Sequence, residues 1–224
     1  MATVAFISPK GGAGKTTAAL LLALGLVERG RKVAIIDSDP NKPLVHWADM
    51  PGKPHGISVH PAPSMHDVPA ALREARRKEP DWVILDTEGS IRGALAFTAL
   101  RLDMVITPLA GSQLEADQAL VASQLVRQHG VRAGHPLLHR ALLTRVPAAL
   151  RPRNLKSVIG QLREQGMELL PTALIEKEAF RALFALGGGL DHLAKHDVSG
   201  VPAAMANAEA YVDAVLETLS ARVA

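Results

Sequence analysis

Glycine, lysine and threonine residues are closely spaced near the start of the chain. The run consists of Lys10, Gly11, Gly12, Ala13, Gly14, Lys15, Thr16 and Thr17. Small or absent side chains at 11–14 let backbone N–H groups curl around an anion, and a helix that starts there directs its positive N-terminus at the same anion. Lys15 would reach the β- and γ-phosphates of a nucleotide, and the Thr16 hydroxyl would bind Mg²⁺. The pattern predicts a nucleotide-phosphate cradle.

The residue before this run departs from the general phosphate-loop pattern. A strict phosphate loop begins with glycine five positions before Gly14, where this chain has Pro9, so the pattern is met only in part. The next position holds an additional lysine, Lys10. The flanking context is the required one, because an apolar strand-like segment at 3–8 precedes the run and an apolar helix-forming segment at 18–27 follows it.

Acidic residues follow two further β-branched runs. Asp37 and Asp39 come after the apolar residues 33–36, and Asp86 comes after 82–85. Because the carboxyl ends of parallel strands meet at one edge of a sheet, we expect these carboxylates to lie beside the phosphate cradle. Carboxylate oxygens are ligands that Mg²⁺ prefers.

The whole chain alternates short β-branched runs with longer helical patterns. We expect strands near 3–8, 32–37, 56–60, 82–86, 103–107 and 139–144, with a further candidate at 167–170. This alternation predicts an α/β, Rossmann-like P-loop fold, in which helices cover both faces of a mostly parallel sheet. A length of 224 residues with 48% hydrophobic content suits a single domain spanning 1–224.

Composition excludes several classes of protein. The chain has no cysteine, which rules out disulfides, thiolate zinc sites and iron–sulfur clusters. No uninterrupted apolar stretch reaches the ~20 residues that a bilayer span needs, so we expect a cytoplasmic protein. The 25 basic against 22 acidic residues permit contact with a polyanion without requiring it.

Three motifs together resemble those of a known family. The run KGGAGKTT at 10–17 resembles the deviant Walker A motif of the ParA/MinD ATPases, whose extra lysine crosses a dimer interface to the partner's nucleotide. The sequence DSDP at 37–40 resembles the second acidic motif of that family, and WVILDT at 82–87 resembles its Walker B strand. Further stretches along the chain are similar to the small VirC-type members, which promote DNA transfer.

The resemblance implies a role for each matching residue. Residues 10–17 should bind ATP, and Lys10, Lys15 and Asp39 should be catalytic. Thr16 should ligate Mg²⁺ directly, while Asp37 and Asp86 hold magnesium waters. Asp39 should orient the attacking water, and Lys10 should stabilise charge on the partner's nucleotide. Where the family commonly has a proline after the Walker B aspartate, this chain has Glu88, to which we assign no role.

A long interval of the chain lacks acidic residues. No aspartate or glutamate occurs between Asp117 and Glu164, whereas basic residues are frequent there. Such a surface would neutralise DNA phosphates without reading bases, and an ordinary solubilising surface is the alternative. The predicted DNA contacts are Arg145, Arg151, Arg153 and Lys156.

The combined prediction is an ATP-dependent homodimer that binds DNA non-specifically and hydrolyses ATP slowly until a partner protein stimulates it. It would position or partition a cargo, such as a plasmid, a transferred DNA complex or a protein cluster, in the cytoplasm and on the nucleoid. A MinD-like membrane-associated ATPase and a metabolic P-loop enzyme are the alternatives. The segment 203–223 argues against membrane binding, because acidic residues oppose its apolar stripe.

Overall fold

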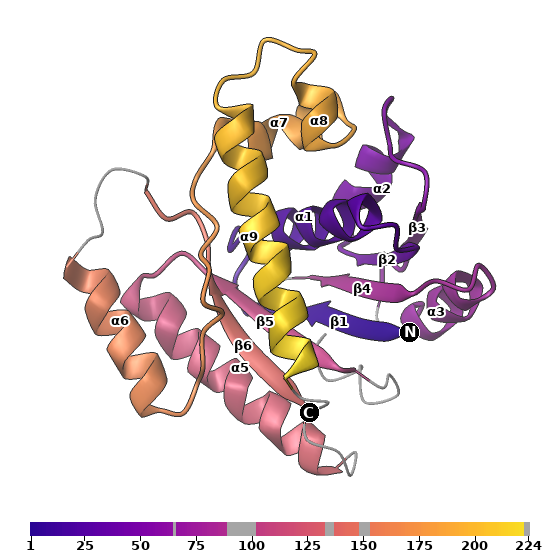
Figure 1. Cartoon of the computed structure of the whole chain (residues 1–224). Coiled ribbons are helices and arrows are strands. Elements are labelled where there is room, and N and C mark those ends of the chain that lie inside the picture. Colours follow the sequence, from indigo (N-terminus) through magenta and orange to yellow (C-terminus); the bar gives the residue numbers. More distant parts are fainter. Residues whose placement is uncertain (65, 89–101, 133–136, 148–152, 222–224) are drawn as a thin grey trace.

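In the described part of the chain, the core of the fold is a sheet of six parallel strands. A computed structural model describes residues 1–64, 66–88, 102–132, 137–147 and 153–221 (Figure 1). The strand order is β3-β2-β4-β1-β5-β6. The strands are β1 (Ala2–Phe6), β2 (Val33–Ser38), β3 (Ile57–Pro61), β4 (Trp82–Thr87), β5 (Met104–Leu109) and β6 (Leu138–Leu143). The predicted α/β fold class is therefore confirmed, with strand ends within two residues of those expected.

Helices cover both faces of this sheet. Alternate side chains of β2 point to opposite faces: Val33 and Ile35 pack with α1, whereas Ala34 and Ile36 pack with α3. Both faces are apolar, as a doubly covered parallel sheet requires. The helices are α1 (Lys15–Glu28), α2 (Pro43–Asp49), α3 (Val68–Arg76), α5 (Gln113–Arg132), α6 (Arg153–Glu164), α7 (Glu178–Leu186), α8 (Leu190–Leu193) and α9 (Val201–Ser220).

The candidate strand at 167–170 is absent. Leu169 forms only an isolated parallel bridge with Ala141 of the edge strand β6. The Leu170 N–H donates to the Ala141 carbonyl at 2.8 Å, but Pro171 follows and has no N–H to continue the ladder. A second isolated bridge joins Val146 to Ile175 further along. The segment after α6 is thus connected to the edge of the sheet by isolated bridges and not by a continuous ladder.

The last helix packs on the body of the protein. Figure 1 shows α9 lying across α1, and α9 buries Tyr211, Val212 and Val215. The Tyr211 hydroxyl donates to the Ala18 carbonyl of α1 at 3.3 Å. Within the residues that the structure describes, no helix is both long and apolar enough to span a bilayer. The apolar stripe of this segment is therefore packed on the core.

Candidate functional site

The loop between β1 and α1 has the shape that a phosphate cradle requires. Gly12 and Gly14 have φ values of +80° and +87°, in the left-handed region that favours glycine. Helix α1 starts at Lys15, directly after this turn, and its first turn contains no acidic residue. The first N–H groups of a helix have no partner within the helix, so they remain available to an anion.

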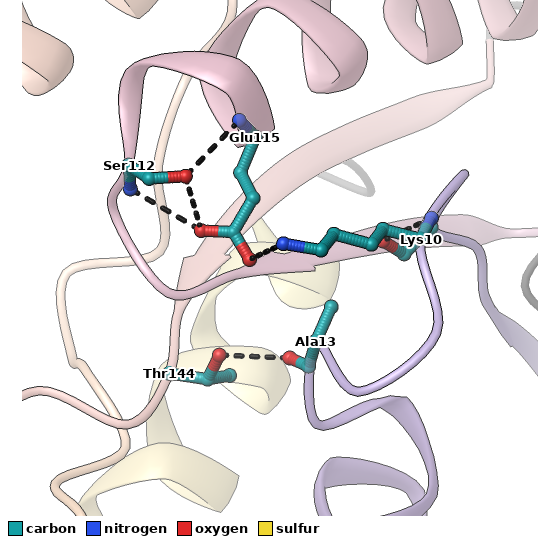
Figure 2. A network of polar contacts seen from close by, with 6 residues as sticks. Lys10, Ala13, Ser112, Glu115 and Thr144 are labelled. Carbon is teal, nitrogen blue, oxygen red and sulfur yellow. Dashed lines mark hydrogen bonds and ion pairs between the residues drawn. The ribbon is translucent and has the colours of Figure 1, made fainter.

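A side chain from β6 holds this loop in place. The Thr144 hydroxyl, just beyond β6, donates a buried hydrogen bond of 2.8 Å to the Ala13 carbonyl (Figure 2). The Thr144 N–H in turn donates to the Leu109 carbonyl at the end of β5 at 2.9 Å. These hydrogen bonds connect the cradle to β5 and β6, which come about a hundred residues later in the chain. The sequence did not indicate this connection.

Lys15 lies inside the cradle. Its relative exposure is only 6%. Burial lowers the pKa of Lys15, and the negative charges of Asp86, Asp39 and Glu88 act in the opposite direction. The predicted phosphate lysine and three carboxylates therefore meet at the carboxyl edge of the sheet. Glu88, which received no role from the sequence, is near enough to influence the charge of Lys15.

Asp86 and Thr16 form the part of the site that suits a cation. The Thr16 hydroxyl donates to Asp86 Oδ2 at 2.7 Å. Asp86 is fully buried, and its second oxygen, Oδ1, has no hydrogen-bond partner among the residues that the structure describes. Burial raises the pKa of Asp86 to about 7, against the opposing effect of the Thr16 hydrogen bond. A buried carboxylate with an unpartnered oxygen beside a hydroxyl fits the predicted Mg²⁺ site.

Asp37 has structural partners that the sequence did not reveal. Its Oδ2 accepts hydrogen bonds from the N–H groups of Leu44 (2.9 Å) and Val45 (3.1 Å), at the start of α2. Burial raises its pKa, whereas these backbone N–H groups lower it. The strand register places Asp37 directly beside Asp86. Asp37 thus lies next to the candidate cation site, and its role in holding a magnesium water stays a prediction.

Asp39 lies in the loop between β2 and α2. Its Oδ1 accepts a hydrogen bond from the Asn41 N–H at 2.8 Å, which closes a short turn. Asp39 is half-buried and close enough to Lys15 for its charge to raise the pKa of that lysine. This location agrees with a carboxylate near the terminal phosphate, but the assignment as the water-orienting residue stays a prediction.

The Lys10 side chain extends from the phosphate loop toward the start of α5. This side chain is 50% exposed, and Nζ lies 3.9 Å from Oε1 of the nearly buried Glu115 (Figure 2). The other Glu115 oxygen accepts hydrogen bonds from the N–H (3.2 Å) and hydroxyl (2.9 Å) of Ser112. Ser112 and Glu115 form a capping box at the start of α5. The S-x-x-E pattern at 112–115 predicts this cap from the sequence, but it does not predict the contact with Lys10.

The structure describes the side chains of two of the four predicted DNA contacts, Arg145 and Lys156. Arg145 lies beside the phosphate loop, with Nη1 4.0 Å from the position that a Cβ on Gly12 would occupy. Lys156 is exposed on the first turn of α6. Arg151 falls outside the described residues, and Arg153 begins α6 with a side chain that is also outside the description.

The raised pKa of Asp86 predicts how stability depends on pH in protein without nucleotide and Mg²⁺. The folded state binds this proton more tightly than the unfolded state, whose carboxyl titrates near 3.8. The free energy of unfolding should therefore fall as pH rises from about 4 to about 7, by up to about 4 kcal/mol from this group. Urea unfolding across this range measures the effect.

Asp86→Asn provides the control for this prediction. The variant should lose the Asp86 part of the dependence and be more stable than the natural chain at pH 8. The difference between the two proteins isolates Asp86, because other buried groups such as His139 titrate in both. Equal pH profiles for the two proteins would contradict the prediction.

A parallel sheet with a glycine-rich phosphate loop after β1 and carboxylates at the carboxyl ends of β2 and β4 defines a P-loop nucleotide-binding protein. The family model described as VirC1 protein matches residues 1–222, and the chain belongs to this family. Its relatives are P-loop ATPases of the ParA/MinD type, so the resemblance inferred from the three motifs is confirmed.

Two relatives illustrate the match. Protein ParA of Rhizobium radiobacter is 30% identical over 229 residues, covering 98% of this chain and 98% of that protein. Protein virC1 of the same organism is 26% identical over 187 residues, covering 82% of this chain and 80% of that protein. The chain is therefore a member of a group of partition and positioning ATPases.

Solved structures support the fold. Apo McdA from Cyanothece superimposes with a TM-score of 0.74 at 16% identity, covering 98% of this chain and 99% of that one. An ATP complex of a McdA variant gives a TM-score of 0.71 at 17% identity, covering 96% of each chain. At such low identity these similarities establish the architecture alone.

Proposed function

We propose that this protein is a positioning ATPase that dimerises when ATP binds, associates with DNA regardless of sequence, and is reset by a partner protein that stimulates slow ATP hydrolysis. Residues 1–224 would act as a single domain in the bacterial cytoplasm, on the nucleoid when ATP is bound. Membership of the VirC1 family supports the general class. The dimer, the DNA contact and the hydrolysis are our proposals.

The different directions of the two loop lysines are the observation that carries this proposal. Lys15 is buried in the cradle, whereas Lys10 is half-exposed and points toward Glu115 of α5. A lysine that served only its own nucleotide would be expected to turn into its own cradle. A side chain at the rim is instead placed to reach a nucleotide held by a second copy, where its charge would stabilise the transferred phosphoryl group.

The remaining site residues would complete the reaction centre. The amides of Gly12–Thr17 and the Lys15 ammonium would bind the β- and γ-phosphates. Thr16 would ligate Mg²⁺ and the neighbouring carboxylates Asp37 and Asp86 would hold its waters; the ion would neutralise charge on the phosphates. Asp39 would hold the attacking water in line with the terminal phosphate.

Light scattering combined with phosphate release tests the proposal. The natural chain should double its mass with ATP and Mg²⁺ but remain monomeric with ADP, and it should release phosphate slowly. A protein that stays monomeric under all conditions while turning over ATP would contradict the dimer. Turnover that requires an added small acceptor would instead support a metabolic enzyme.

The outer side of α6 supports a DNA contact. This helix buries Leu155, Val158 and Leu162 and exposes Lys156 and Arg163, so its basic residues face outward. Arg140, by contrast, is paired with Glu168 at 2.5 Å and is not available. We propose Lys156, with Arg151 and Arg153 just before it in the chain, as phosphate contacts; a single copy would bind weakly and a dimer more tightly.

Salt dependence should identify such binding. Retention on unrelated DNA fragments should require ATP, vary little with sequence and fall steeply with salt, the log–log slope changing by roughly 0.9 for each lost phosphate contact. Reversing the charges of Arg151 and Arg153 to Glu should abolish retention while ATP-dependent dimerisation remains, because the cradle lies in other loops. Tight binding with ADP, strong sequence preference or unaffected binding by the reversed variant would contradict this surface.

A membrane-associated function is the second candidate, and the structure offers little for it. The apolar side of α9 is already packed on α1, and its exposed surface carries the acidic residues Glu209 and Glu217. An acidic outer face repels anionic lipid. ATP-dependent sedimentation with anionic vesicles, without retention on DNA, would favour this candidate.

A further inference from the structure

We propose that Arg145 binds the nucleotide, on the nucleoside side of the phosphate cradle. Its place in the acid-free interval predicted a DNA contact, and this proposal replaces that prediction. The inference rests on the proposed nucleotide binding and adds a residue to that site. It follows from where Arg145 lies, how its backbone is held and which charges around it are already paired.

Arg145 lies against the phosphate loop. Its Nη1 is 4.0 Å from the point where a Cβ on Gly12 would sit, so the guanidinium is within van der Waals reach of the loop at this glycine. Arg145 also lines a pocket that reaches from Gly14 and Thr17 of the cradle to Phe180 of α7. The guanidinium therefore stands between the phosphate positions and an adjoining hollow.

The backbone of Arg145 is held in an unfavourable conformation. Its φ of +52° lies in the left-handed region, which costs a non-glycine residue of order 1 kcal/mol or more. Both neighbours are fixed: the Thr144 hydroxyl bonds to the Ala13 carbonyl, and the Val146 N–H donates to the Leu174 carbonyl at 3.2 Å. Residues held in such conformations by their surroundings cluster at ligand sites.

The charge of Arg145 is available to a ligand. Glu176, an acidic residue that lines the same pocket, is paired with Arg181 at 2.8 Å. Within the described residues, Arg145 forms no ion pair of its own. An exposed guanidinium beside a phosphate loop has the geometry to bind a phosphate oxygen through two N–H groups.

The rest of the pocket suits a nucleoside. Leu174, Ile175 and Phe180 provide apolar surface, and Lys177 adds a second positive charge. A flat base can pack on such surface while the guanidinium contacts the phosphate nearest the sugar or lies over the base. Because that part of the ligand is common to ATP and ADP, Arg145 should strengthen the binding of both nucleotides by a similar factor.

Titration with fluorescent ATP and ADP tests the assignment. Arg145→Gly is the suitable variant, because glycine adopts the positive φ without strain and should fold at least as well as the natural chain. Its affinity for both nucleotides should fall roughly 10- to 100-fold, the usual strength of a hydrogen bond to a charged group.

Arg73→Ala is the matched control, since it removes an exposed arginine from α3 on the opposite face of the sheet and should leave nucleotide affinity unchanged. Failure of the natural chain to bind nucleotide would refute the proposed function itself. Unchanged nucleotide affinity in Arg145→Gly, with a natural chain that binds, would overturn this inference alone. Reduced DNA retention of Arg145→Gly at saturating ATP, with unchanged nucleotide affinity, would return Arg145 to the DNA surface.

Discussion

The Lys10→Ala protein should bind ATP nearly as well as the natural chain, but it should not dimerise with ATP. Its rate of ATP hydrolysis should be at most roughly a thousandth of the natural rate, which is the loss typical when a charge supplied by a partner is removed. The reason is the position of Lys10, whose half-exposed side chain extends toward α5. Light scattering and phosphate release with ATP and Mg²⁺ measure the two effects.

Lys15→Ala is the control that separates binding from assembly. Lys15 is buried in the cradle, so its removal should abolish tight nucleotide binding itself. Mixing the two variants adds a sharper test, because Lys10→Ala can still hold ATP while the Lys15→Ala chain still carries Lys10. Partial recovery of turnover in the mixture would support action across the interface. A Lys10→Ala protein that dimerises and hydrolyses normally would remove the central inference.

The second large effect is expected at Asp39. Asp39→Ala should bind ATP and Mg²⁺ but hydrolyse roughly 10²- to 10⁴-fold more slowly, because the attacking water loses the group that orients it and accepts its proton. Since hydrolysis is what dissolves the proposed dimer, the variant should remain dimeric long after the natural chain has returned to monomers. Light scattering over time after one addition of ATP records this lifetime.

Asp39→Asn is the matched control for local structure. Asparagine keeps an oxygen that can accept the hydrogen bond from the Asn41 N–H, so the turn should persist while the charge is lost. Both variants should therefore share the slow hydrolysis. A variant that stays monomeric with ATP would mean that Asp39 has a metal-binding or structural role and that the roles of Asp37 and Asp39 are exchanged.

The sequence predicted the fold and most of the cradle because their signals are local. Apolar runs mark the buried strands, and glycines at 12 and 14 stand where the loop needs positive φ values. The gathering of Lys15, Asp86 and Asp39 followed from the rule that parallel strands end at one edge. The failed strand at 167–170 shows the limit of that approach, because Pro171 ends the ladder although the preceding residues look strand-like.

Contacts between distant segments were beyond prediction from one sequence. Nothing near Thr144 indicates that its hydroxyl reaches Ala13, since that depends on how β6 ends beside the loop. Nor does the basic interval show that Arg145 turns toward the cradle while Lys156 faces outward on α6. The sequence shows how many charged residues a segment contains. Which face of the protein each charged side chain lies on depends on the folded backbone.

The contact between Lys10 and Glu115 sets a concentration threshold in the proposed dimer. In a symmetric pair both lysines must leave their own Glu115 before both nucleotides are reached, so the cost of release enters the association constant twice. A half-exposed ion pair of ordinary strength, which leaves about one lysine in three available, would raise the concentration needed for assembly about tenfold. Because Glu115 is also fixed by Ser112, it cannot follow the lysine outward. The residue that starts α5 would thus determine how much ATP-loaded protein must accumulate locally before pairs form.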